Sequence, residues 1–298
     1  MIDLEIAERR AAEIEAQALA AKERVRQRRY VAKALLRSPT FMVGVGIVVF
    51  WVLMALFSTS FTQSPDVVHP SDILAAPSAS HLFGTDDLGR DVFARTLAGS
   101  RTVLIIAPLA TLLGLLWGGI IGLVAGFYRG LVDDVIMRII DALLALPIII
   151  TAILILSLFG KSLAIVIIVI GVLFTPVVSR TVRSAVIVER EREYVTAARL
   201  RGERGWFIMV FEILPNITQP LVVEGTVRLG YAVFTAATIS FLGFGLQPPS
   251  PDWGLTIATE RVNLQAAPWT VLFPAFALAI LVVGVNLIAD GLSTVLSR

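Results

Sequence analysis

Residues 194–216 read YVTAARLRGERGWFIMVFEILPN, a short and partly polar stretch between two long apolar ones. Gly202 and Gly205 divide it, and Pro215 lies near its end. Glycine ends helices and proline interrupts them, so the pattern predicts two short helices that meet at residues 202–205 and are cut off by Pro215. The sequence on either side indicates what kind of protein carries this helical hairpin.

The composition is that of a membrane protein. Of the 298 residues, 56% are hydrophobic and only 16% are charged, whereas soluble domains have about 25% charged residues. The chain has no cysteine, which excludes a disulfide framework, a thiolate metal site and a cysteine nucleophile. Residues 1–37 are highly charged and lack the apolar core of a signal peptide, so no cleavable signal is predicted.

Six apolar stretches lie near residues 41–57, 102–126, 139–159, 163–179, 219–242 and 269–289. Each is close to the roughly 20 residues that a helix needs to cross a bilayer. Lipid offers no hydrogen-bond partner to a free backbone amide, so these spans have to be helical. The sequence therefore predicts an all-α polytopic membrane protein with six transmembrane helices.

The distribution of positive charge predicts the orientation of the spans. Segments 1–40, 127–138, 180–218 and 290–298 hold 19 of the 25 lysines and arginines, and segments 58–101, 160–162 and 243–268 hold 5. Because positive charge stays on the cytoplasmic side, both termini and the opening hairpin are predicted to face the cytoplasm. This gives a charged cytoplasmic helix at 1–39 and a transmembrane domain at 40–298, with outer loops 58–101 and 243–268 and a cytoplasmic loop 180–218.

The N-terminal segment has small and apolar residues along one helical seam, which predicts a helix that ends at Ser38-Pro39. A solvated or membrane-surface helix is favoured, and a short coiled coil is the alternative because alanine-rich seams are weak. The seam consists of Leu4, Ala7, Ala11, Ile14, Ala18, Ala21 and Val25.

Small residues and prolines mark the spans. The second span carries a row of glycines one helical turn apart, which lets another helix approach at backbone distance. The row is Gly114, Gly118, Gly122 and Gly126. Packing within this chain is favoured over a surface beside a pathway through the membrane. Pro147, Pro176 and Pro274 lie inside the third, fourth and sixth spans, where kinks are expected.

The outer segments are expected to be accessory structure. From Asp91, the apolar residues Val92, Phe93, Leu97 and Val103 predict an amphipathic helix at the outer interface before the second span. The segment FLGFGLQPPSPDWG, rich in proline and glycine, predicts a compact loop above the membrane.

The sequence lacks the motifs of a metalloenzyme or a nucleotide-binding protein. His69 and His81 lie in the outer loop among several aspartates, but no metal-ligand spacing such as HExxH is present, so solvated loop histidines are favoured. The sequence GKS at 160–162 lacks the upstream glycine of a phosphate-binding loop, since Ile155 stands there. Basic residues do not alternate with aromatic ones, so no nucleic-acid surface is predicted.

One pair of charges lies inside a span. Glu224 and Arg228 are four residues apart on one face of the fifth span, in the order that favours pairing. A structural ion pair against another helix is favoured. The alternative is that the pair lines a pathway or meets a partner subunit, because ionisable groups in spans are often functional.

The hairpin itself has the features of a docking element. Ala197 and Ala198 leave the backbone approachable, and Tyr194 and Leu200 are expected to fill a pocket. Positive charge is expected at the rim of the contact, from Arg199, Arg201 and Arg204.

At these residues the sequence resembles the cytoplasmic motif of permease subunits of bacterial ATP-binding-cassette importers. The family pattern is Glu-Ala-Ala, three residues, Gly, nine residues and Ile-x-Leu-Pro. Ala197, Ala198, Gly202, Leu214 and Pro215 match it, whereas Thr196 and Glu212 stand in place of the Glu and the Ile. FGTDDLGRDVFARTLAGSRTVL and SFLGFGLQPPSPDWG resemble the peptide, dipeptide and nickel branch, specifically the second of its two permeases, across residues 40–298.

The resemblance implies a type I importer permease in the bacterial cytoplasmic membrane that is not itself an enzyme. It implies a second homologous permease, two ATP-binding-cassette domains that bind ATP and Mg²⁺ and hold the cytoplasmic helix, and an extracytoplasmic substrate-binding protein. Lipid surrounds the spans, and this chain is expected to bind no cofactor. Peptides are the expected substrate, with nickel chelates or haem as alternatives. A secondary transporter is a more distant alternative, since no internal repeat or coupling-ion carboxylate is evident.

Overall fold

The structure is a computed structural model that describes residue 26 and residues 30–296. The predicted seam from Leu4 to Val25 lies outside the described residues, but the helix at 30–37 does stop at Ser38. Ser38 caps the next helix, because its hydroxyl accepts a hydrogen bond from the amide of Phe41.

The described residues form helices, with a single isolated β-bridge between Thr85 and Asp91 and no strand. The helices are α2 (Pro39–Phe61), α3 (Val92–Tyr128), α4 (Gly130–Leu144), α5 (Ile148–Phe159), α6 (Leu163–Glu189), α7 (Glu193–Leu200), α8 (Gly205–Phe207), α9 (Leu214–Asn216), α10 (Thr218–Phe241), α11 (Trp253–Glu260) and α12 (Trp269–Leu296). Three short segments complete the described chain: η1 (Pro70–Asp72), the π-helical η2 (Ile208–Ile213) and η3 (Arg261–Asn263).

The spans number six, and two of them are broken. Helices α2, α3, α6 and α12 are each long and apolar enough to cross a membrane. Two bent pairs, α4 with α5 at 87° and residues 205–216 with α10 at 70°, bring the number to six if each pair is taken as one span. In the second pair α10 is the part assigned to the membrane, and residues 205–216 lead into it. Pro147 lies at the first break, where it precedes α5. Pro176 and Pro274 have the smaller effect, because α6 and α12 continue through them.

Helix α3 corrects one expectation from the sequence. The residues from Asp91 onward do not form a separate helix on the outer interface but the first turns of α3, with Asp91 as its cap. The apolar face that suggested an interfacial helix is buried in the protein: Val92, Leu97 and Val103 are 5% exposed or less. This face contacts the protein core and not the lipid headgroups.

The glycine row of α3 lies along α6. A Cβ atom added at Gly114 would lie 3.0 Å from the Cβ of Phe174, and one added at Gly118 would lie 2.6 Å from the Cβ of Val178. The pattern repeats at Gly122 with Val182 at 2.7 Å and at Gly126 with Val186 at 2.8 Å. Because both partners advance by four residues, the two helices stay in contact along their whole shared length.

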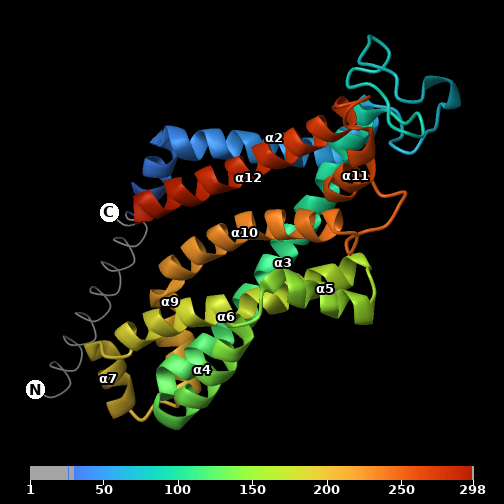
Figure 1. The fold of residues 1–298 in the computed structure, drawn as a ribbon. Coiled ribbons are helices and arrows are strands. Elements are labelled where there is room, and N and C mark those ends of the chain that lie inside the picture. Colours follow the sequence, from blue (N-terminus) through green and yellow to red (C-terminus); the bar gives the residue numbers. More distant parts are fainter. Residues whose placement is uncertain (1–25, 27–29, 297–298) are drawn as a thin grey trace, which may run out of the picture.

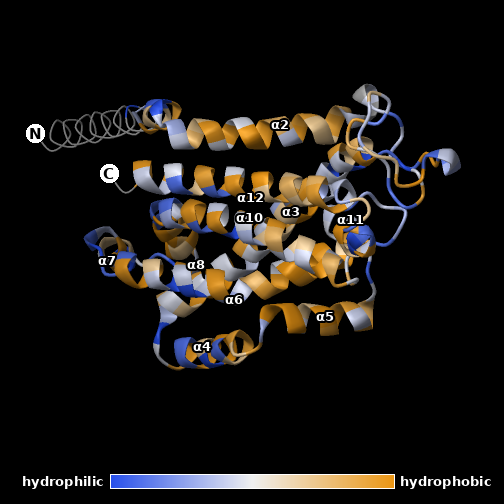
Figure 2. Cartoon of the chain, turned by 45° about the horizontal axis from the view of Figure 1, so that its top comes forward, coloured by the Kyte–Doolittle hydropathy of each residue, from blue (hydrophilic) through white to orange (hydrophobic). Residues whose placement is uncertain are grey.

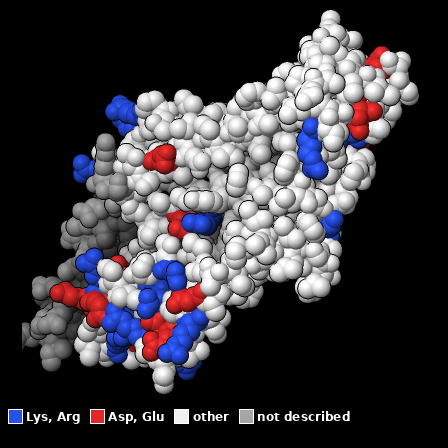
Figure 3. Space-filling model, viewed as in Figure 1, with Lys and Arg blue, Asp and Glu red and all other residues white. Residues whose placement is uncertain are grey.

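The arrangement of the helices separates two ends of the molecule (Figure 1). Helices α2 and α12 lie side by side, and α10 lies between this pair and α6. The start of α2, the end of α12 and α7 lie at one end, and the outer loop 62–91 and α11 lie at the other. Figure 2 shows hydrophobic residues along α2, α5 and α12, and Figure 3 shows dense charge at the α7 end. By the positive-inside rule, the α7 end is the one expected to face the cytoplasm.

Candidate functional site

The cytoplasmic hairpin, residues 193–216, turns at Gly202. This glycine has a φ of +78°, and a side chain there would meet no atom within 4 Å. The amide of Glu203 donates to the carbonyl of Ala198, and the amide of Gly202 donates to that of Arg199. These bonds close the end of α7 in the manner of helices that finish at a left-handed glycine. The turn therefore requires glycine because of its backbone and not because of crowding.

One side of the hairpin is fixed to the body of the chain. Val195, Ala198, Ile208 and Ile213 are at most 1% exposed and pack with apolar residues of α3 and α6. This corrects the expectation that Ala198 presents an approachable surface to a partner. Ala198 is small because the hairpin packs directly onto its own protein.

Tyr194 also faces the protein rather than a partner's pocket. Its hydroxyl donates to the Oε1 atom of Glu189 at 2.9 Å. Burial, and then this hydrogen bond, raise the pKa of Tyr194 to about 12. The phenol therefore remains a neutral donor that ties α7 to the end of α6.

The opposite side of the hairpin is open. Leu200 is 85% exposed, Trp206 is 54% exposed, and Ala197 and Gly202 are exposed beside them. Arg201 is held by Glu203 at 2.7 Å and by Glu212 at 3.5 Å. Exposed leucine and tryptophan on a rigid polar hairpin form a surface of the kind that proteins use for binding.

The hairpin continues into α10 through an irregular joint. The segment η2 is π-helical, and the amide of Leu214 donates to the carbonyl of Met209 five residues earlier. Pro215 has no amide hydrogen, and in a regular α-helix its ring would clash with the preceding turn. The wider turn of a π-helix relieves this clash. Contrary to expectation Pro215 does not end the helix, which continues to Asn216 before the 70° bend.

The intramembrane charges form a pair on α10. The Nε atom of Arg228 donates to Glu224 Oε1 at 2.7 Å. Thr181 of α6 donates to the other carboxylate oxygen at 3.3 Å. The guanidinium of Arg228 also lies 4.8 Å from the ring centre of Tyr231. The side chains of Arg228 and Glu224 are 17% and 13% exposed, so the pair is largely buried and reaches the surface of this chain only in part.

At the outer end, Arg95 joins the two outer loops. Its guanidinium donates to the carbonyls of Pro65 at 3.1 Å, Pro249 at 3.4 Å and Ser250 at 3.2 Å, and to the carboxylate of Asp66 at 3.2 Å. Its side chain is 5% exposed. No sequence motif predicted a role for Arg95. The available signal was an arginine within the apolar helical pattern of residues 92–103, and Arg101 shares that signal.

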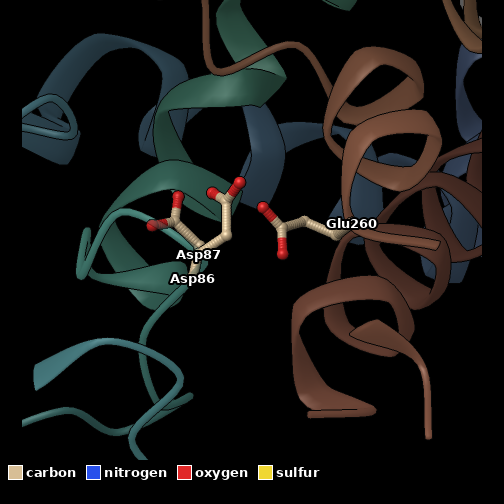
Figure 4. Close-up of side chains that lie close together, drawn as sticks. All are labelled: Asp86, Asp87 and Glu260. Carbon is tan, nitrogen blue, oxygen red and sulfur yellow. The ribbon is translucent and has the colours of Figure 1, made fainter. Parts of the chain in front are cut away.

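Three carboxylates meet beside this arginine (Figure 4). One carboxylate oxygen from each of Asp86, Asp87 and Glu260 lies within 4.8 Å of the other two. The three side chains point toward one another. Burial first, and then the nearby Asp87 and Asp86, raise the pKa of Glu260 to about 7. Arg90 pairs with Asp86 at 2.7 Å, so much of the charge is already balanced. No sequence spacing pointed to Glu260, because its partners lie far away in the chain.

One of the two outer-loop histidines, His81, does not match the expectation of a solvated side chain. His81 is only 12% exposed, and its Nδ1 atom lies 2.9 Å from the carboxylate of Asp91, the cap of α3. His69 lies close to it, with ring centres 6.1 Å apart. His81 therefore fastens the outer loop to the start of α3.

Comparisons with known proteins agree with this architecture. Residues 118–298 match the family described as binding-protein-dependent transport system inner membrane component. The chain is 41% identical over 261 residues to the dipeptide transport system permease protein DppC of Alkalihalophilus pseudofirmus, covering 87% of this chain and 86% of that one.

Two further relatives have other named substrates. The glutathione transport system permease protein GsiD of Pectobacterium atrosepticum is 35% identical, with 84% of each chain covered. The probable D,D-dipeptide transport system permease protein DdpC of Escherichia coli is 33% identical, with 87% of each chain covered.

Proposed function

We propose a function from the premise that this chain belongs to the family of binding-protein-dependent transport system inner membrane components. The chain is a membrane-spanning permease subunit of an ATP-driven peptide importer and forms half of the pathway across the bacterial cytoplasmic membrane. It is a non-catalytic subunit, because its relatives are named as permeases, and on this proposal ATP hydrolysis is the task of partner subunits.

The observation that carries this proposal is the two-sided cytoplasmic hairpin. Its inner side shares a buried apolar cluster with α3 and α6, and its outer side presents Leu200 and Trp206. A force applied to the outer side is transmitted to the helices, because the packed core resists deformation. The residues of this coupling surface are Ala197, Leu200, Arg201, Gly202 and Trp206, with Tyr194, Ala198, Leu214 and Pro215 as its support.

Several partners follow from the same proposal. A second, homologous permease completes the pathway, and two ATP-binding-cassette domains bind beneath, one on each permease's hairpin. An extracytoplasmic protein delivers the substrate to the outer loops. ATP and Mg²⁺ bind to the ATPase partners, and this chain binds no cofactor and no nucleic acid.

Peptides are the substrate class that the relatives support best. Three relatives are named for dipeptides, glutathione and D,D-dipeptides, which share a peptide backbone and free terminal charges. Nickel chelates or haem remain the alternative cargo for this architecture. Dependence of uptake on added ATPase subunits separates the importer from a secondary transporter, which needs an ion gradient instead.

A pair of matched variants tests the coupling surface. Leu200→Glu places a charge on the proposed ATPase contact, and Val262→Glu places one at a site that is 80% exposed at the opposite end of the molecule. Leu200→Glu should abolish co-purification of the ATPase subunits and peptide-dependent ATP hydrolysis in proteoliposomes. Val262→Glu should leave ATPase binding intact. Normal ATPase binding by Leu200→Glu, at wild-type protein level, would show that the hairpin is not the docking element.

A further inference from the structure

One face of α10 is partly open to the surroundings of the chain, at exposed Tyr231, Phe234 and Phe241 and at partly buried Glu224 and Arg228. This face carries the only ion pair of that helix among the described residues. The opposite face is buried, at Gly225, Gly230 and Val233 among others, and packs against α3 and α12. The open face follows helical spacing and is called the α10 stripe. It consists of Glu224, Arg228, Tyr231, Phe234, Thr238 and Phe241.

The stripe connects the two ends of the span. Glu224 lies six residues beyond Thr218, which corresponds to about 9 Å along the helix from the joint with the hairpin. At the outer end, Phe234, Thr238 and Phe241 line a groove of about 170 Å³ beneath α11. Figure 3 shows an acidic and a basic group side by side in the otherwise uncharged middle of this face, where Figure 1 places α10.

The energetics of charge in a membrane restrict what the stripe can face. A guanidinium and a carboxylate within a span are costly against lipid and are found facing water-filled cavities or other protein. The aromatic residues beside the pair are strongly exposed in this chain, Tyr231 by 55% and Phe234 by 56%. A stripe that mixes exposed rings with an ion pair suits a wet pathway that amphipathic molecules cross.

Arg228 has hydrogen-bond donors that no described residue accepts. Its Nε atom is occupied by Glu224, and its ring contact is with Tyr231. Its two terminal nitrogens make no hydrogen bond to any residue that the structure describes. Those nitrogens form the planar fork that binds carboxylates with two parallel hydrogen bonds. Thr181 donates a hydrogen bond to Glu224, and Glu224 accepts one from the Nε atom of Arg228. These two bonds fix the position of the guanidinium.

We propose that Arg228 binds the C-terminal carboxylate of a peptide in transit, with Glu224 and Thr181 as positioning residues. This inference rests on the proposed function and names the feature of the substrate that is recognised. Every linear peptide with a free C-terminus offers this carboxylate whatever its side chains. Recognition there allows one pathway to accept peptides of different sequence.

Uptake of matched peptides tests the proposal. Reconstituted complexes with saturating binding protein are given the same dipeptide as the free acid or as the C-terminal amide. The acid-to-amide uptake ratio of each variant is divided by that of the wild type, which cancels the selectivity of the binding protein. Arg228→Gln should lower the ratio by about tenfold, the loss expected for charge-assisted hydrogen bonds, and Arg228→Lys should lower it less.

Arg180→Gln is the control, because Arg180 forms its ion pair with Asp141 and not with Glu224, which pairs with Arg228. Its ratio should equal that of the wild type. A ratio unchanged by Arg228→Gln, or changed equally by Arg180→Gln, would overturn the proposal while leaving wild-type import intact. Absence of ATP-driven import in the wild type would instead refute the proposed function.

A second measurement covers the case in which Arg228→Gln does not assemble. Because the chain has no cysteine, a single cysteine can be placed at Phe234 and compared with one at Leu53 on the exposed side of α2. A membrane-impermeant thiol reagent should label Phe234→Cys, and a transported peptide acid should slow the labelling more than its amide does. Labelling of Phe234→Cys no faster than of Leu53→Cys would overturn the proposal.

Discussion

Replacing Gly118 by alanine should separate α3 from α6, and the structure gives the size of the effect. The added methyl carbon would lie 2.6 Å from the Cβ of Val178 and 2.8 Å from the carbonyl oxygen of Thr175. Carbon atoms pack at about 3.5–4.0 Å, so the two helices would have to move apart by roughly 1 Å. Rotation of a side chain cannot relieve the clash, because a Cβ and a backbone carbonyl are fixed to the helix.

Gly119 provides the matched control, since a Cβ there would meet nothing within 4 Å. Both positions lie inside α3, so alanine improves the helical preference of each by about 1 kcal/mol, and this gain cancels in the comparison. Overpacking costs about 1–3 kcal/mol. Gly118→Ala should therefore be less stable than Gly119→Ala by that amount.

The measurement is the midpoint of thermal unfolding of each purified complex in one detergent, followed by tryptophan fluorescence. A shift of about 2–4 °C per kcal/mol is typical of proteins of about 150–250 residues and is smaller for larger ones, so Gly118→Ala should melt measurably below Gly119→Ala. If both variants melt at the same temperature, the contact between the glycine row and α6 does not determine the stability of the protein, and the reasoning is refuted.

Two further predictions concern the two ends of the molecule. Gly202→Val should lower the stability of the hairpin by about 1–3 kcal/mol, because valine does not tolerate a φ of +78°. Limited proteolysis should therefore cleave the hairpin faster in the variant while the spans stay intact. Unchanged cleavage would show that a side chain does not strain the turn. The raised pKa of Glu260 contributes stability that is complete below its ordinary value of 4.5 and lost as pH rises through about 7. Hydrogen exchange in the outer loops, corrected for the intrinsic rate, should therefore be faster at pH 8 than at pH 6. Glu260→Gln should remove this difference between the two pH values. If the variant keeps the difference, Glu260 is not its source.

Much of the fold follows from local sequence. The length of the apolar stretches, the charge distribution and the four-residue spacing of the glycines are local patterns, and each corresponds to a feature of the structure. The turn at Gly202 was readable for the same reason, because it depends on one residue's backbone. Local patterns of this kind require no knowledge of what lies beside them.

The expectations that failed depend on distant partners. Ala198 looks approachable in the sequence, but its burial depends on helices α3 and α6. The apolar face after Asp91 suggests an interface helix, but the core covers it. Glu260 carries no signal at all, since its neighbours Asp86 and Asp87 lie in the other outer loop. The spacing of apolar residues indicates which face of a helix is covered. It does not indicate whether lipid or protein covers that face.

The role of Arg95 as the link between the outer loops has a consequence for the biogenesis of the protein. Its partner Pro249 lies 154 residues further along the chain. At roughly 5–20 residues per second, the ribosome needs about 8–30 s to reach that partner. During this interval Arg95 has left the ribosome but cannot be satisfied by the second outer loop. The first half of the chain therefore waits at the membrane with Arg95 held only by its earlier partners Pro65 and Asp66. In a protein truncated before residue 249, the guanidinium never gains the carbonyl partners of the second outer loop.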